Sequence, residues 1–247
     1  MTTGSTGFYG KVPSLGDFVT RRLPTELIAP WDQWLQESLA ASRTQLGDSW
    51  LDRYLTSPLW RFVLSPGVAG QTVWTGVLMP SVDRVGRYFP LTLACPLPAG
   101  TNPMAVLGAA DWFDQAEDLA LSALGEPFSL ETFDAQVLAL GAPQVAAPPT
   151  GPRAPEAPGR PNAWHLSAAT VADLPGACTT LLAHTFEVVF LGYSLWWTQG
   201  SDAVAPSLLT CQGLPPADGF TALLNGDWGG CGWRLLDASP APPTARA

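Results

Sequence analysis

The sequence predicts an α+β fold, in which a mainly antiparallel sheet is flanked by helices. Three segments rich in aromatic and β-branched residues follow one another between residues 59 and 97, with Pro and Gly at their borders. Only short connections separate them, which favours antiparallel pairing. Segments with the apolar spacing of helices precede and follow this group. Strands and helices grouped in this way are typical of α+β domains.

The first helix is predicted over residues 27–46, where apolar side chains recur with a helical period. Pro30 suits its first turn, and Gly47 suits its end. A short second helix follows over residues 48–57, with Asp48 as its N-cap.

The three strands are predicted over residues 59–65, 72–80 and 87–97. Pro90 lies inside the third segment and cannot donate a hydrogen bond to a neighbouring strand. This strand is therefore predicted either to lie at an edge of the sheet or to be interrupted at Pro90.

Two further helices complete the N-terminal part. Asn102 is the predicted N-cap of a helix over residues 104–124, and Pro103 suits its first position. Ser129 is the predicted N-cap of the next helix, over residues 130–140.

A Pro-rich connector over residues 142–162 separates two parts of the chain. The larger N-terminal part covers residues 7–141. The smaller part, residues 163–236, is predicted to pack on the same sheet as one domain. The tail, residues 237–247, is predicted to be disordered.

The C-terminal part is predicted to hold a strand over residues 163–170 and a helix over residues 175–190. Residues 193–200 and 206–213 follow as a β-hairpin, and residues 215–226 form a short closing helix. The whole order of elements is loosely similar to longin or profilin modules, an analogy of fold that says nothing about function.

Composition excludes several classes of protein. The net charge of −9 argues against nucleic-acid binding, which needs a basic surface. The N-terminus lacks the features of a signal peptide, and no apolar run is long enough to insert in a membrane, so a cytoplasmic protein is expected. Charged residues are only 13% of the chain, which leaves room for the apolar patches that mark partner sites. The eleven tryptophans are expected mostly in the core, and interface anchors are the alternative.

The segment around Gly10 and Lys11 fails as a phosphate-binding loop. A Walker A motif requires glycine where Ser5 stands and a hydroxyl where Val12 stands, and no helix follows directly. The chain has no G-x-S-x-G, and its two histidines and four cysteines lack the spacing of catalytic or zinc motifs. A non-catalytic protein without cofactor or metal is therefore expected.

Two segments combine glycine with charge, namely residues 7–24, GFYGKVPSLGDFVTRRLP, and residues 80–90, PSVDRVGRYFP. One interpretation pairs Asp17 with an arginine of the second segment and Asp83 with an arginine of the first, so that the two loops are fixed together. The other makes the charged side chains one exposed binding patch. The candidate residues for loop clamping or partner binding are Lys11, Asp17, Phe18, Arg21, Arg22, Asp83, Arg84, Arg87, Trp196 and Trp197.

These segments, with WDQWLQ, WLDRYLTSPLWRFVLSPG, GVLMPSVDRVGRYFPLTLACPLP, YSLWWTQGS and GLPPADGFTALLNGDW, resemble the TagF family of type VI secretion-associated regulators. The resemblance covers most of the chain, except the connector and the two ends. It implies a cytoplasmic, non-catalytic, post-translational repressor of type VI secretion that acts through the forkhead-associated scaffold protein of the apparatus. It assigns no binding residues and no oligomeric state.

Two other hypotheses stay open. The first is an anion- or nucleotide-sensing module that uses Lys11, Arg21, Arg22 and Arg87. The second is an enzyme of unrecognised type, although no acid–base or nucleophile set converges in the sequence.

Overall fold

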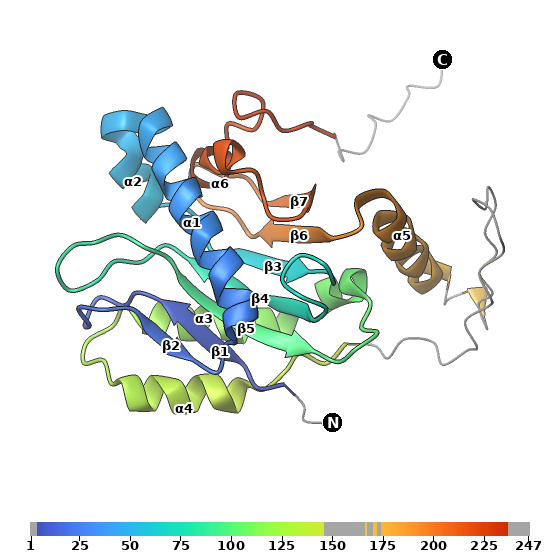
Figure 1. Ribbon diagram of the computed structural model, residues 1–247, viewed down its shortest axis with the longest axis horizontal. Helices are drawn as coiled ribbons and strands as arrows, with labels where there is room; N and C mark the ends of the chain where they lie inside the picture. Colours follow the sequence, from blue (N-terminus) through green and yellow to red (C-terminus); the bar gives the residue numbers. More distant parts are fainter. Residues whose placement is uncertain (1–3, 146–165, 167–169, 172–173, 237–247) are drawn as a thin grey trace, which may run out of the picture.

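The computed structural model describes residues 4–145, 166, 170–171 and 174–236. Seven strands form one antiparallel sheet with the order β2-β1-β5-β4-β3-β6-β7 (Figure 1). The predicted α+β fold with a mainly antiparallel sheet flanked by helices is confirmed. The strands are β1 Gly7–Gly10, β2 Val19–Arg21, β3 Trp60–Leu64, β4 Val73–Met79, β5 Leu91–Leu97, β6 Tyr193–Thr198 and β7 Ser207–Gln212.

Helices cover both faces of this sheet. One face packs against α1, α2 and α6, and the other packs against α3, α4 and α5 (Figure 1). The helices are α1 Thr25–Leu46, α2 Trp50–Leu55, α3 Ala110–Ser122, α4 Leu130–Leu140, α5 Leu174–Phe190 and α6 Thr221–Asn225, with the 3-10 helices η1 Gly47–Ser49, η2 Pro103–Gly108 and η4 Ala217–Gly219.

The C-terminal strands extend the sheet that the N-terminal strands begin. Strand β6 pairs with β3, from Arg61 opposite Trp197 to Leu64 opposite Ser194. Strand β7 then pairs with β6 as the second arm of the predicted hairpin. Segments on the two sides of the connector therefore share one continuous sheet.

An aromatic core under α1 holds the first face together. Trp31 stacks on Trp196 with ring centroids 5.7 Å apart, and both rings pack against Phe62. The Nε1–H of Trp31 donates to the hydroxyl of Thr92 at 2.9 Å, and that of Trp34 donates to the Pro215 carbonyl at 2.7 Å. Large aromatic rings bury much apolar area, and their buried N–H groups need such partners. Trp196, a predicted contact residue, is fully buried here and offers no surface to a partner.

The opening segment forms two short strands where the sequence indicated only loops. In β1, a Cβ on Gly7 would lie 2.3 Å from the Arg21 carbonyl oxygen, and one on Gly10 would lie 2.1 Å from the Pro90 carbonyl oxygen. Gly10 also has a φ of +139°, which L side chains rarely adopt. These glycines let neighbouring strands approach closely and do not form a phosphate cradle.

Strand β5 lies inside the sheet, between β1 and β4. Placing this strand at an edge was therefore wrong, and the alternative prediction, an interruption at Pro90, is confirmed because β5 begins at Leu91. Pro90 lies directly before the strand, where its missing N–H costs no hydrogen bond between strands, whereas Pro96 lies within β5 opposite Trp74.

Three helix details differ from the predictions. Residues 103–122 divide into η2 and α3, because Ala109 leaves helical geometry after Gly108. Asp48 lies within η1 and does not cap α2, whose cap position is Ser49. Helix α1 begins at Thr25, so Pro30 lies beyond its first turn.

The remaining elements follow the sequence pattern. The side chain of Asn102 caps η2 and that of Ser129 caps α4, as predicted. Helix α5, the β6–β7 hairpin and a closing helix are also present. The strand predicted over residues 163–170 and the tail lie almost entirely outside the described residues, as does most of the connector.

Candidate partner-binding site

The two glycine-and-charge loops lie directly against each other. One loop follows β1, and the other connects β4 to β5. The backbone N–H of Arg84 donates to the Leu15 carbonyl at 2.9 Å, and the Ser81 hydroxyl donates to the Lys11 carbonyl at 2.8 Å. From the other side, the Tyr54 hydroxyl of α2 donates to the Ser81 carbonyl at 2.8 Å. The fold therefore brings together two loops that lie about seventy residues apart in the sequence.

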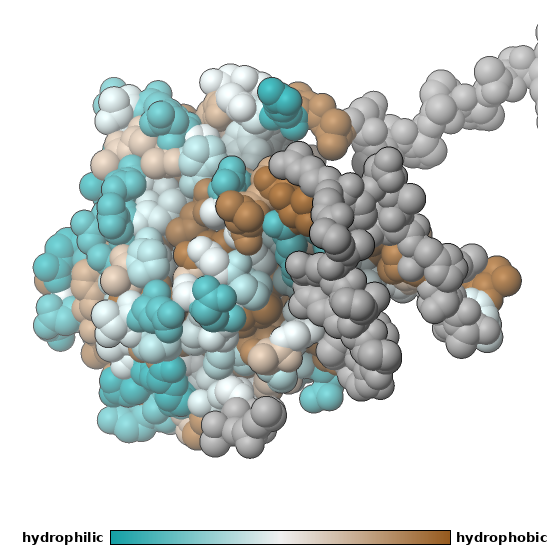
Figure 2. Space-filling model, turned by 45° about the vertical axis from the view of Figure 1, so that its right-hand side comes forward, coloured by the Kyte–Doolittle hydropathy of each residue, from teal (hydrophilic) through white to brown (hydrophobic). Residues whose placement is uncertain are grey.

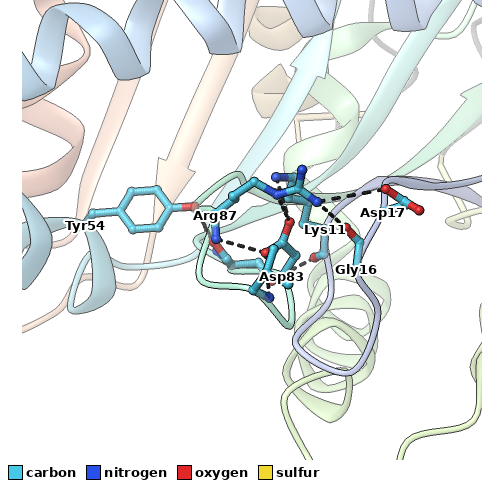
Figure 3. Close-up of polar contacts among 8 residues, drawn as sticks. Lys11, Gly16, Asp17, Tyr54, Asp83 and Arg87 are labelled. Carbon is cyan, nitrogen blue, oxygen red and sulfur yellow. Dashed lines mark hydrogen bonds and ion pairs between the residues drawn. The ribbon is translucent and has the colours of Figure 1, made fainter.

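Asp83 is the centre of this loop pair (Figure 3). Its fully buried carboxylate lies 3.0 Å from Lys11 Nζ and 2.6 Å from Arg87 Nε. It also accepts backbone N–H groups from Val85 at 3.0 Å and Arg87 at 2.9 Å. The guanidinium of Arg87 reaches across to the carbonyl of Gly16. Four donors around one carboxylate make a charge-assisted clamp between the loops.

The predicted pairing of the acidic residues is right for Asp17 and wrong for Asp83. Asp17 Oδ1 lies 3.9 Å from an Arg87 nitrogen, at a fully exposed position where such a pair contributes little. From the first loop, Asp83 pairs with Lys11 and not with Arg21 or Arg22. The compact ammonium of lysine fits this enclosed position, and both first-loop arginines are held elsewhere.

The surroundings of Asp83 shift its pKa. Burial by itself raises the pKa, but the hydrogen bonds from the Arg87 backbone, Lys11, the Arg87 side chain and the Val85 backbone outweigh it and hold the pKa well below its usual range. A carboxyl whose folded-state pKa is depressed stabilises the fold above its unfolded pKa of about 4, and this contribution is lost as the pH falls through the folded-state pKa.

This shift predicts how stability depends on pH. Above about pH 5 the wild type should melt several degrees higher than an Asp83→Asn variant, and the difference should narrow as the pH falls from about 5 towards 2. Thermal melts over this range, with Asp17→Asn as the matched exposed control, check the result. A difference between wild type and Asp83→Asn that stays constant down to pH 2 would contradict the charged clamp.

The clamp supports an exposed surface, here called the loop-pair surface, which consists of Asp17, Phe18, Arg84, Val85 and Arg87. Phe18 is 46% exposed and Val85 is 65% exposed. The ring of Phe18 is held in place because it stacks on Tyr9, with ring centroids 5.6 Å apart. The surface combines two arginines with two apolar side chains on loops of fixed shape.

Arg21 and Arg22 belong to a different cluster. Arg22 Nη1 lies 2.5 Å from Asp134 of α4, and Arg22 Nε donates to the Thr6 carbonyl at 2.8 Å. Arg21 lies 4.0 Å from the same carboxylate. The four cations of the predicted anion site are thus divided between Asp83 and Asp134 and do not converge on one ligand.

Trp197 also lies away from the loop-pair surface. Its half-buried ring packs edge-on against Phe113 of α3, with centroids 4.7 Å apart. Of the predicted candidates, the structure gathers Lys11, Asp17, Phe18, Asp83, Arg84 and Arg87 in one place.

A hollow of about 530 Å³ borders this surface, lined by Arg43, Trp50, Leu51, Gly86, Arg87 and Tyr88. The guanidinium of Arg43 lies 4.2 Å from the centre of the Trp50 ring, a cation–π contact. Arg43, Trp50 and Tyr88 were not among the candidate residues predicted from the sequence. Arg43 and Trp50 lie near the C-terminal end of α1 and at the start of α2, and only the folded chain places them beside Gly86.

In the part of the chain that the structure describes, no three His, Cys, Asp or Glu residues are grouped so that they could hold a metal ion. None of the helices there is long and apolar enough to cross a membrane.

Comparison with models of protein families identifies the family of this chain. Residues 7–140, more than half of its 247 residues, match the family model of the TagF N-terminal domain, described as type VI secretion system-associated. The chain belongs to this TagF family. Both loops of the loop-pair surface lie within the matched TagF range.

The likeness to a solved structure extends beyond the TagF range. The crystal structure of PA0076 from Pseudomonas aeruginosa PAO1 is 41% identical to this chain, covers 97% of this chain and 100% of its own, and superposes with a TM-score of 0.79. The search of curated proteins found no match. The C-terminal hairpin and α5 therefore also belong to an architecture seen in a solved structure.

Proposed function

We propose that this chain is a non-catalytic, cytoplasmic, post-translational repressor of type VI secretion, which acts by binding the forkhead-associated scaffold protein of the apparatus. Membership of a type VI secretion-associated family supports a role in type VI secretion. The observation that carries the mode of action is the loop-pair surface, where the buried Asp83 clamp fixes two loops and leaves Arg84, Val85 and Phe18 exposed.

The chemistry of this surface suits protein recognition. Arginine and aromatic side chains are enriched among the residues that dominate binding energy. Loops that are already fixed lose little conformational entropy on binding, so more of the contact energy appears as affinity. On a chain of net charge −9, the local arginines also select for an acidic or polar partner surface.

A secretion assay tests this function. Deleting the gene should raise the amount of secreted substrate in the medium without raising transcripts of the apparatus, and the wild-type chain should restore repression. The double variant Arg84→Glu with Val85→Asp should fail to repress, although its melting temperature stays close to that of the wild type, because both side chains are exposed.

Arg21→Glu is the matched control, since Arg21 is also an exposed arginine but contacts Asp134 instead of the loop pair. It should repress like the wild type. Full repression by the double variant, or equal loss of repression in Arg21→Glu, would overturn the assignment of this surface. Unchanged secretion after deletion would overturn the repressor function itself.

A second function is favoured by one observation. Arg43 has no ion-pair partner within the described ranges, and it lines the same hollow as Arg87. Two guanidinium groups on one hollow suit a small anion, which would make the chain a sensor. A thermal-shift series with phosphate, nucleotides and phosphorylated sugars tests this: a melting-temperature rise that Arg43→Gln removes supports the sensor, and no rise at millimolar concentration excludes it.

A further inference from the structure

The two edges of the sheet differ in their protection. An exposed edge strand is a template for pairing with another chain, and most proteins shorten it or place charge on it. At one edge, β2 has only three residues; it ends on Arg21, and Arg22 and Pro24 follow. This edge has the usual protection.

The opposite edge, β7, is longer and uncharged. Its six residues, SLLTCQ, include no proline, although Pro206 directly precedes them. The side chain of Leu208 is 63% exposed. Figure 2 shows apolar side chains gathered on the side of the molecule that carries α5 and the β6–β7 hairpin, where Val188 is 61% exposed and Leu191 is 83% exposed.

The register of the hairpin shows which backbone groups face outward. The N–H of Gly213 donates to the Gly192 carbonyl at 2.9 Å, which continues the β6–β7 ladder by one pair. Because residues along an antiparallel strand turn their backbone groups alternately to either side, Leu208, Thr210 and Gln212 direct theirs away from β6. No backbone hydrogen bond to these outward groups is made by any residue that the structure describes.

We propose that β7 pairs antiparallel with β7 of a second copy of this chain, around a two-fold axis at Thr210. In this register Thr210 lies opposite its own copy and Leu208 lies opposite Gln212. All outward residues of both strands are then paired, through about six hydrogen bonds. An odd number of outward residues with Thr210 at their centre makes this edge complementary to itself, as a two-fold interface requires.

Charge and side-chain chemistry favour a second copy as the occupant. The neutral β7 can meet itself without repulsion, whereas two copies of β2 would bring arginines together. A Thr–Thr pair directly opposite across strands is favourable. Pairing would join two seven-stranded sheets into one and shield Leu208. This association is independent of the repressor function proposed above.

Cysteine cross-linking tests the register. In a Cys178→Ser background, which removes the exposed native thiol, Thr210→Cys places two thiols on residues whose Cα atoms are about 5.5 Å apart in the pair, within disulfide range. Gln212→Cys is the matched control on the same exposed face, because the two copies of residue 212 are then about 14 Å apart. Mild oxidation should give a covalent dimer with Thr210→Cys and not with Gln212→Cys.

Sedimentation of the full chain over a concentration series tests the association itself. The wild type should form a dimer whose population rises with concentration. Thr210→Lys should stay monomeric, because two lysines would lie directly opposite each other, while its melting temperature as a monomer should be unchanged. A wild type that stays monomeric at the highest concentration, or equal cross-linking of both cysteine variants, would overturn the pairing.

Discussion

Replacing Trp196 with alanine is expected to lower the free energy of unfolding by about 3–5 kcal/mol. Trp196 is fully buried, its ring stacks on Trp31, and its Nε1–H donates to the Ser194 hydroxyl at 2.9 Å. Removing the indole leaves a cavity between α1 and the sheet and removes one hydrogen bond to the Ser194 hydroxyl, which keeps its bond to the Gly213 carbonyl. Urea unfolding followed by circular dichroism measures the loss.

Trp197 provides the matched control next to it in the chain. Its ring is only half-buried and packs on Phe113 at the other face of the sheet. Trp197→Ala should therefore lower the free energy of unfolding clearly less than Trp196→Ala does. A Trp196→Ala variant that unfolds like the wild type but loses partner binding would show that this tryptophan is a contact residue after all.

Replacing Gly10 with alanine is expected to lower the free energy of unfolding by about 2–5 kcal/mol, through overpacking together with backbone strain. The new Cβ would lie 2.1 Å from the Pro90 carbonyl oxygen and 2.8 Å from the Leu91 Cα. Both are backbone atoms, so relief requires β1 and β5 to separate. The same urea titration measures the loss.

Gly86→Ala separates the steric part of this effect from the conformational part. Gly86 has a φ of +83°, but a Cβ there would meet nothing within 4 Å. Only the strain of a left-handed alanine remains, about 1–2 kcal/mol. Equal losses for Gly10→Ala and Gly86→Ala would contradict the close packing of β1 on β5.

The sequence predicted the long elements well because their patterns extend over many residues. Helix α1 presents Trp31, Trp34 and Leu35 on one face, and β4 is buried along its whole length and mostly apolar. Strands β1 and β2 were missed because they have four and three residues, too few for a periodic pattern. Their glycines also suggest a loop, although here they permit close strand packing.

The candidate site was predicted in part for a similar reason. The combination of glycine and charged residues identified both loops in the sequence. In the structure the ion pair between Asp83 and Lys11 joins them. Which cation would reach Asp83 depends on the direction of each side chain as it leaves β1 and β2. The sequence does not contain this information in any local pattern, and the same holds for Arg43, which reaches the site from α1.

Calorimetric titration of the purified chain with the purified forkhead-associated scaffold tests the central claim most directly. The wild type should bind saturably. The double variant Arg84→Glu with Val85→Asp should bind at least about tenfold more weakly, a difference of about 1.4 kcal/mol, while Arg21→Glu should bind like the wild type. Absence of binding by the wild type, or equal affinity of all three proteins, would contradict the proposal that this surface recognises the scaffold.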